Sequence, residues 1–259
     1  MTKYSAIFGN FKWVVSIGII LGIWWLSTSL NWINPLFLPS LDDLGNAIRE
    51  LLTNKTIYLD AFATAYRALI GLVLSAIVAI PLGLVLGRMQ GVYEYIEFPV
   101  DFFRSIPSSA LFFLFILVFG VGDLSKIAVV FYGCSLIILV ATIYGAKVNK
   151  EKQDRINMLT AFRATPFQVF HLAVVRDALP HITAGLRISV SLSLVLGIVT
   201  EMFLGATNGL GRQIYDFYLR YEVPKMYAVI IILGLLGFAF NKLFFILERK
   251  LSFWQPAEK

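Results

Sequence analysis

The sequence is poor in charge, in cysteine and in histidine, and each shortage excludes a class of protein. Only 15% of its 259 residues are charged and 58% are hydrophobic, whereas soluble domains carry about 25% charged residues. The single cysteine, Cys134, excludes an internal disulfide framework, and two histidines without a cysteine cluster form no metal-binding pattern. We therefore expect a membrane protein with no metal site, in which Cys134 packs as a small buried hydrophobic residue.

Motifs for chemistry are missing as well. The chain contains no G-x-x-x-x-G-K-[ST] phosphate-binding loop. No catalytic nucleophile with an accompanying general base stands out either. We therefore expect a protein that is not an enzyme, that has no cofactor, and that draws its energy from a partner subunit or an ion gradient. The net charge of +6 follows the loops. This distribution argues against nucleic-acid binding and is typical of the positive-inside bias of membrane proteins.

Apolar runs of membrane-spanning length dominate the chain. A helix needs about 20 apolar residues to cross the hydrocarbon core of a bilayer. Such runs lie at 13–30, 65–87, 103–121, 127–146, 187–206 and 226–247. The first run is longer than a signal-peptide core and is interpreted as a retained first span. The sequence thus predicts an all-α, polytopic membrane protein with about six transmembrane helices in one domain, 1–259, whose core spans cover 65–247.

The basic residues of the loops predict the orientation of these spans. If both termini are cytoplasmic, the inner side holds twice as many Lys and Arg residues as the outer side. This topology also makes the long polar segment 147–180 cytoplasmic.

That segment, Lys147 to Pro180, is the longest polar break in the chain and contains a helix start. The stretch Thr165-Pro166-Phe167-Gln168 has a capping threonine, a proline at the first helical position and a glutamine that can complete a capping box. An apolar side follows from Phe167 and Phe170, and Pro180 is expected to end the helix. A short amphipathic helix at the inner membrane face predicts a docking element.

Polar residues within the third apolar run are candidates for a transport pathway. This run opens with two prolines and an Asp101/Arg104 pair, and irregular polar backbone at membrane depth is tolerated only beside protein or water. The candidates are Arg104, Ser105, Ser108 and Ser109. The alternative is ordinary helix–helix hydrogen bonding by small residues.

Two charged residues near the predicted outer ends of spans are further candidates. Arg67 either contacts an anionic solute at the outer mouth of the pathway or snorkels to the surface. Glu201 lies inside the fifth run, where a charge is costly, so it serves either the pathway or a structural bond to a loop amide or a basic partner. In the second span, Gly83 and Gly87 are four residues apart and predict a close approach to a neighbouring helix.

Short matches to a known family recur in a fixed order and spacing from about Leu38 to Trp254. They are Leu38-Pro39-Ser40, Arg67-Ala68-Leu69-Ile70-Gly71, Ile80-Pro81-Leu82-Gly83-Leu84 with Gly87, Ile106-Pro107, Val118-Phe119-Gly120-Val121-Gly122-Asp123 with Ser125-Lys126, Gly185-Leu186-Arg187, Glu201-Met202 with Asn208-Gly209-Leu210-Gly211, and Leu247-Glu248-Arg249. Together they resemble the transmembrane permease subunit of bacterial ABC importers of the nitrate/sulfonate/taurine/bicarbonate group.

The resemblance implies the type I ABC importer fold, a location in the bacterial inner membrane and a set of partners. These are a second permease copy, giving a homodimer, two ATPase subunits that carry ATP and Mg, and an extracytoplasmic substrate-binding protein. The implied substrate is a small anion such as nitrate, bicarbonate or a sulfonate. Two alternatives stay open: the same role with a vitamin precursor or another small organic substrate, and an ion-gradient-driven secondary carrier.

In this family the cytoplasmic loop forms a coupling helix that sits in a groove of the ATPase. The residues that the resemblance assigns to this contact are Arg163, Ala164, Thr165, Pro166, Phe167 and Phe170. The glycine that usually turns the loop falls at Arg163. A different backbone, or a helix that continues, is therefore expected at this position.

Overall fold

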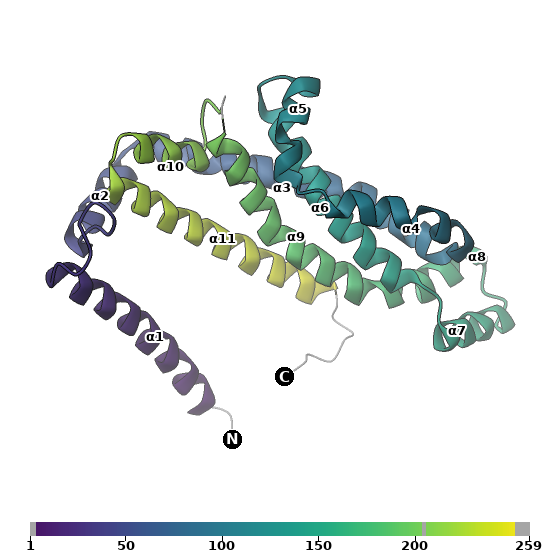
Figure 1. Ribbon diagram of the computed structural model, residues 1–259. Coiled ribbons are helices and arrows are strands. Elements are labelled where there is room, and N and C mark those ends of the chain that lie inside the picture. Colours follow the sequence, from purple (N-terminus) through teal and green to yellow (C-terminus); the bar gives the residue numbers. More distant parts are fainter. Residues whose placement is uncertain (1–3, 204–205, 252–259) are drawn as a thin grey trace. The chain divides into compact units, whose positions relative to one another are not determined.

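The structure is a computed structural model that describes residues 4–203 and 206–251 (Figure 1). All regular elements in these residues are helical, which confirms the all-α prediction. The predictions also used Lys3, Leu204, Gly205, Trp254 and Lys259, which lie outside the described residues. The helices are α1 Tyr4–Ser29, α2 Leu41–Thr53, α3 Lys55–Arg88, α4 Gln90–Ser105, η1 Ser108–Leu111, α5 Phe112–Phe119, α6 Asp123–Ala146, α7 Lys150–Ala161, α8 Pro166–Val169, η2 Phe170–Val175, α9 Arg176–Met202, α10 Leu210–Leu219 and α11 Val223–Leu251.

Four helical stretches among the described residues are long and apolar enough to cross a membrane. They are Lys55–Arg88, Asp123–Ala146, Pro166–Met202 and Val223–Lys250. Three of them contain the predicted spans 65–87, 127–146 and 226–247, and Pro166–Met202 contains residues 187–202 of the span predicted at 187–206. The first predicted span, 13–30, overlaps α1, whose segment Val14–Ser29 is a shorter apolar helix. The sequence therefore located these spans correctly, although most of the helices extend beyond the apolar runs.

The third predicted span is not one continuous helix. The chain bends by 81° between Gly91–Ser105 and Ser108–Phe119, and Figure 1 shows α5 turning away from α4. Proline lacks a donor N–H and biases the preceding residue away from helical angles. Ile106 accordingly has extended backbone angles before Pro107, so the helix that was expected over 103–121 breaks at this proline.

The chain divides into two compact units, which are described separately. The first unit consists of Met1–Tyr58 and Gln213–Ile232. Ser40 caps α2, since its hydroxyl accepts from the Asp43 N–H at 3.1 Å. In the same unit the Trp24 indole donates to the Pro39 carbonyl at 2.9 Å, and the Trp24 ring meets Tyr227 edge to face.

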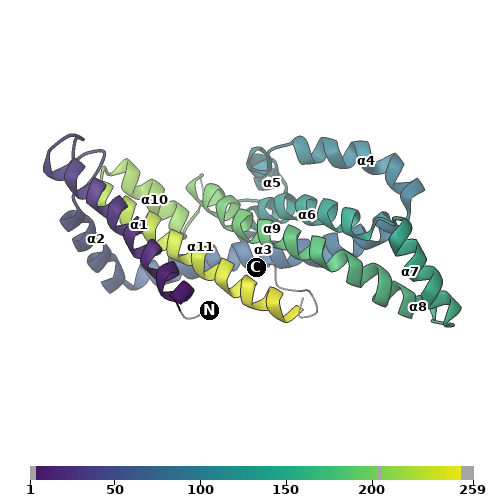
Figure 2. The same cartoon turned by 90° about the horizontal axis from the view of Figure 1, so that it is seen from below.

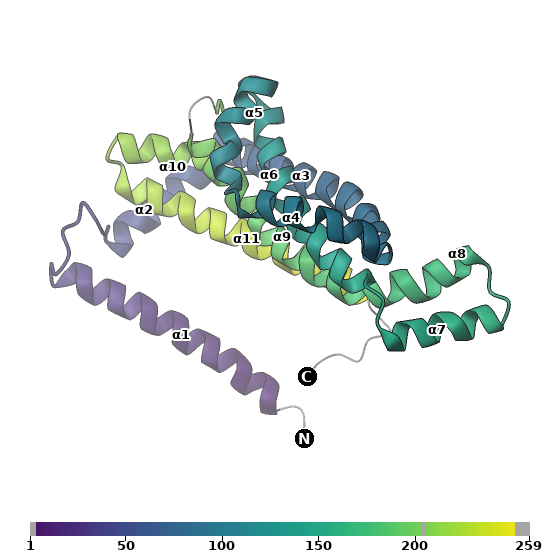
Figure 3. The same cartoon turned by 45° about the vertical axis from the view of Figure 1, so that its right-hand side comes forward.

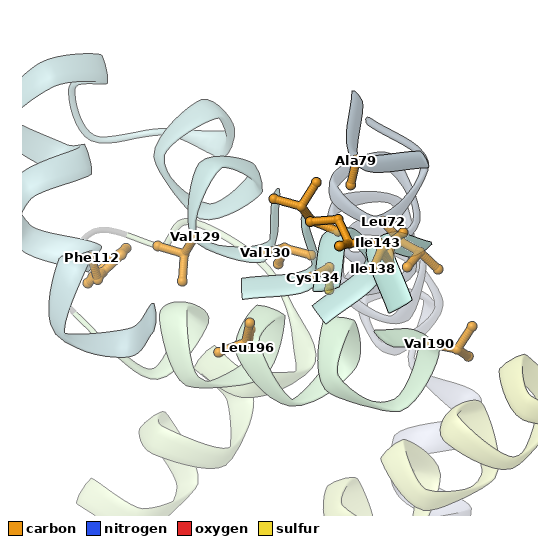
Figure 4. Close-up of a cluster of buried hydrophobic side chains, with 11 residues drawn as sticks. Leu72, Ala79, Phe112, Val129, Val130, Cys134, Ile138, Ile143, Val190 and Leu196 are labelled. Carbon is orange, nitrogen blue, oxygen red and sulfur yellow. The ribbon is translucent and has the colours of Figure 1, made fainter. Parts of the chain in front are cut away.

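The second unit, Leu59–Arg212 with Leu233–Lys259, contains the apolar core that positions the candidate sites. Helices α6 and α9 pack along each other, and α3, α5 and α9 contribute to a cluster built on α6. Val130, Cys134 and Ile138 are spaced four residues apart, and all three are fully buried in this cluster (Figure 4). The prediction that Cys134 acts as a small buried hydrophobic residue is confirmed.

Glycines allow α3 to approach α6 closely, as their spacing predicts. A Cβ on Gly83 would lie 2.6 Å from the Thr142 Cβ, and a Cβ on Gly87 would lie 2.6 Å from the Ile143 carbonyl oxygen. Real Cβ atoms do not approach that closely, so any side chain at either position would push the two helices apart.

Candidate functional site

One end of the second unit contains a buried ion cluster centred on Arg67. The Arg67 side chain is only 2% exposed, and its Nη1 lies 2.6 Å from Oε1 of Glu201, whose side chain is 0% exposed. The same guanidinium contacts Asp123 Oδ1, with Nη2 at 2.7 Å, and Asn208, with Nη1 donating to its carbonyl at 3.0 Å and Nη2 donating to its side-chain oxygen. All three guanidinium nitrogens therefore have partners, as a buried charge requires.

The acceptors of this cluster also fix the start of α10. Three successive N–H groups at this helix start donate to side chains: Gly209 to Asp60 at 2.7 Å, Leu210 to Thr64 at 2.9 Å and Gly211 to Glu201 at 3.0 Å. The first N–H groups of a helix have no partner inside the helix. Residues of α3 and α9 supply those partners here, so the cluster ties three elements together.

These contacts bear on the structural interpretations of Arg67 and Glu201, while a pathway role for either residue stays a prediction. Snorkelling of Arg67 is wrong, because its side chain is buried and paired rather than extended to a surface. The structural interpretation of Glu201 is confirmed in both of its forms, since the carboxylate accepts from a basic partner and from the Gly211 amide. In this arrangement neither residue has a free polar atom directed at a solute.

The remaining pathway candidates lie at the break between α4 and η1. Arg104 is exposed and forms an ion pair with Asp101 at 3.1 Å, while the Ser105 hydroxyl donates to the Asp101 carbonyl at 2.9 Å. Ser108 and Ser109 are half-buried in η1. A Cβ on Gly133 would lie 2.6 Å from the Ser108 hydroxyl oxygen, so Ser108 faces α6. The break therefore brings exposed polar groups, including one cation, beside the apolar core.

The polar segment 147–180 folds as a helical hairpin. Helices α7 and α8 project from the ends of α6 and α9 (Figures 2 and 3). The predicted capping box is present: the Thr165 hydroxyl accepts from the Gln168 N–H at 3.3 Å, and the Thr165 N–H donates to the Gln168 side chain at 2.8 Å. The helix start predicted at Pro166 is confirmed.

Arg163 adopts a backbone conformation that glycine favours. Its φ is 57°, in the left-handed region. The Arg163 N–H bonds to the Thr160 carbonyl at 2.9 Å, and the Ala164 N–H bonds to the Leu159 carbonyl at 3.0 Å, which is the Schellman pattern of a helix end. The expectation of a continuing helix is wrong, because α7 ends at Ala161 and this pair of hydrogen bonds closes a turn there.

Pro180 does not end the helix, contrary to the prediction from its sequence position. The helical stretch continues from Pro166 to Met202 and contains Pro180 within α9. The π-helical segment η2, Phe170–Val175, precedes it by about one turn. Wider π-helical turns are one of the ways in which a helix absorbs a break in its hydrogen-bond ladder. The helix that starts at Pro166 and the fifth span therefore form one continuous helical stretch.

Large apolar side chains are exposed at the tip of this hairpin. Phe162 is 80% exposed and Phe167 is 77% exposed, while Met158 and Leu172 are also largely open. Phe170 is exposed to a smaller extent, and Phe167 stacks on His171 with ring centroids 6.4 Å apart. These side chains leave apolar area exposed on an otherwise polar projection.

This helical arrangement is a known one. The structure superposes on a chain of the MetNI methionine ABC transporter, solved in inward facing conformations, with a TM-score of 0.64 and 19% identity over 76% of this chain and 96% of that chain. The fold is thus that of the permease of a type I ABC importer, as the sequence resemblance implied.

Sequence comparison defines the family. Residues 79–253 match the model of the binding-protein-dependent transport system inner membrane component, and the chain belongs to this family. A probable ABC transporter permease of Brucella abortus is 30% identical over 93% of this chain and 94% of its own length. The taurine transport system permease protein TauC of Escherichia coli is 25% identical over 92% of this chain and 88% of its own length.

The family membership makes this chain an ABC importer permease subunit for a small solute. Members of this family work with ATPase and binding-protein partners. The ion-gradient alternative is therefore set aside. Such a subunit transports a solute. The relevant residues are those that line the translocation pathway and those that transmit conformational changes between subunits.

Sequence reasoning missed most partners in the buried cluster. Thr64 and Asp60 were not singled out, and Asp123 and Asn208 entered only as parts of family matches. All four complete the contacts of Arg67, Glu201 and the start of α10. A usable signal existed, since Arg67, Asp123 and Glu201 all lie near predicted outer ends of spans and carry opposite charges. Opposite charges at one membrane level, which cannot remain unpaired in a bilayer, are expected to meet.

Proposed function

We propose that this chain forms the pathway for a small anion in an ATP-driven importer and couples to the ATPase through segment 147–180. The observation that carries the coupling role is the exposed apolar tip of the hairpin, at Phe162 and Phe167. Its capping box and Schellman turn give it a defined shape. A structured apolar surface at the end of the polar hairpin can bind in a groove of a soluble protein. In this family the soluble partner is the ATPase.

The pathway role rests on the broken span between α4 and η1. Irregular backbone in a membrane protein needs protein or water around it. Arg104 and Ser105 are exposed at this break, and Ser108 and Ser109 follow it. An exposed guanidinium is suited to a passing anion, because it offers a planar array of donors. The taurine relative carries a substrate with an anionic sulfonate group, which agrees with nitrate, bicarbonate or a sulfonate as the substrate class.

The orientation and the assembly complete the proposal. The basic residues of the loops favour cytoplasmic N- and C-termini, with α7 and α8 at the cytoplasmic face. Helices α4, α5 and α11 leave apolar side chains exposed, as at Phe98, Leu117 and Leu235. Lipid and a second permease copy would cover them, so the functional unit is a homodimer with two ATPase subunits and an external binding protein.

Replacement of Phe167 by aspartate tests the coupling role. The carboxylate would have to enter an apolar groove, so we expect the ATPase to dissociate or its hydrolysis to continue without uptake. The measurements are co-purification of the ATPase and uptake in proteoliposomes. Tyr221→Asp is the matched control, because Tyr221 is 80% exposed, close to the 77% of Phe167, but lies between α10 and α11. Normal assembly and uptake with Phe167→Asp would show that the hairpin tip is not the docking surface.

A further inference from the structure

Two cationic side chains of α7 connect the hairpin to the ends of two spans. Lys152 Nζ lies 2.6 Å from the Gly145 carbonyl and 3.2 Å from the Lys147 carbonyl, at the last turn of α6. Arg155 Nη1 binds Asp177 Oδ1 in the first turn of α9. A cation beside the free carbonyls of a helix end is favourable, so the lysine contact anchors α7 to α6, whereas the arginine contact joins α7 to α9.

Apolar residues that neighbour Arg155 and Asp177 in the chain are buried on both arms of the hairpin. Ile156, one residue after Arg155, is 7% exposed. On the other arm Val174 and Ala178 are buried, together with Leu84 of α3 and Ala146 of α6. Side chains packed in this way move as a body. A displacement of the hairpin tip therefore reaches the start of α9 at the level of Arg155 and Asp177.

Asp177 has an acceptor that this arrangement leaves unused. Its side chain is 12% exposed, and Oδ1 is bound to Arg155. Oδ2 is buried and has no hydrogen-bond partner among the described residues. A buried carboxylate oxygen without a donor is costly. An arginine fork can satisfy both oxygens of a carboxylate with two parallel hydrogen bonds, and only one such bond is formed here.

We propose that Arg155 and Asp177 are the positioning pair that transmits movement of the hairpin into α9, with one hydrogen bond in this arrangement and two in the alternative one. The inference rests on the proposed docking of the hairpin on the ATPase. Coupling between distant sites requires an element with two arrangements that both sites bias. The pair supplies such an element, because a small shift of α7 along α9 changes the number of bonds without breaking the ion pair.

Arg155→Lys is the most direct test, because it keeps the charge and removes the fork. We expect the ATPase to co-purify as in the wild type, while the amount of solute transported per ATP hydrolysed falls about tenfold. A factor of about ten is the shift in a two-state equilibrium that results when one charge-assisted hydrogen bond is lost in only one of the two states. Arg155→Met should reduce this ratio at least as much. The double variant Arg155→Asp with Asp177→Arg reverses the pair. It should transport more solute per ATP hydrolysed than either single reversal does.

Arg187→Lys is the matched control. Arg187 of α9 also forms an ion pair with a carboxylate, that of Glu248 in α11, away from the hairpin. The amount of solute that the Arg187→Lys variant transports per ATP hydrolysed should therefore stay at the wild-type value. An unchanged ratio in both Arg155 variants, alongside ATPase release by Phe167→Asp, would overturn the inference and leave the proposed function standing. Loss of the ATPase from Arg155→Lys would also overturn it, since the pair would then hold the hairpin fold. Only an unaffected Phe167→Asp would count against docking itself.

Discussion

Arg67 and Glu201 form an ion pair at 2.6 Å inside the protein, although 134 residues separate them in the chain. Neither side chain reaches solvent, and each has additional hydrogen bonds, from Thr64 and Gly211 to the carboxylate and from the guanidinium to Asn208. Breaking a buried pair leaves an uncompensated charge, which costs much more than the loss of an exposed pair. The pair is therefore a structural tie between α3 and α9.

Glu201→Gln is expected to lower the stability of the permease by about 3–5 kcal/mol. One carboxylate oxygen accepts from Arg67, and the other accepts from Thr64 and the Gly211 N–H. An amide nitrogen at either place would face a donor. The measurement is thermal unfolding in detergent, followed by tryptophan fluorescence. Asp101→Asn, in the exposed pair with Arg104, is the control and should cost less than about 1 kcal/mol. A normal melting temperature with impaired uptake would instead make Glu201 a transport residue.

Gly209→Ala should destabilise the start of α10. Gly209 has a φ of 125°, which residues other than glycine rarely adopt. A Cβ added at this position would lie 2.4 Å from the Glu201 carboxyl carbon. We expect a loss of at least about 2 kcal/mol from strain and overpacking together. Gly45→Ala is the control, since it lies within α2 with nothing within 4 Å and should stabilise by about 0.5–1 kcal/mol. Equal melting temperatures for the two variants would contradict this assignment.

Arg163→Gly should stabilise the turn between α7 and α8. The residue keeps a φ of 57°, which costs a non-glycine residue about 1 kcal/mol. Slower local opening is expected, seen as slower amide hydrogen exchange at Arg163 and Ala164, whose N–H groups make the Schellman bonds. Arg163→Val should open faster, because a β-branched side chain is a poor fit to this region. Exchange that is fastest in the glycine variant would contradict the strained-turn account.

Gly87→Ala should separate α3 from α6 near the predicted cytoplasmic face. The added methyl would lie 2.6 Å from the Ile143 carbonyl oxygen and 2.7 Å from the Ala146 Cβ. The Ile143 carbonyl belongs to the helix backbone and cannot shift as easily as the end of a flexible side chain. We therefore expect the free energy of unfolding to fall by about 1–3 kcal/mol, measured by thermal unfolding. Gly91→Ala in α4 has nothing within 4 Å and provides the comparison. If both variants unfold at the wild-type temperature, the two helices do not approach as closely as described.

Local signals in the sequence predicted local structure well. Thr165 and Gln168 predicted a capping box that is present, and Gly83 and Gly87 predicted a close helix contact that is present. These features depend on residues within one turn or on one face of a helix. The errors arose where backbone preference competes with more distant constraints. Pro180 was expected to stop a helix that continues, and a helix was expected as one alternative to continue through Arg163, where α7 has already ended.

The sequence by itself determined the helical class, the position of the spans and the family, because membrane insertion demands long apolar runs and the family motifs are local. Only the tertiary structure decided which charges meet. Arg67 finds Glu201, and Arg155 finds Asp177, across helices that no periodicity connects. A buried charge requires a partner, but the identity of that partner depends on how the helices pack, and packing is a property of the whole fold.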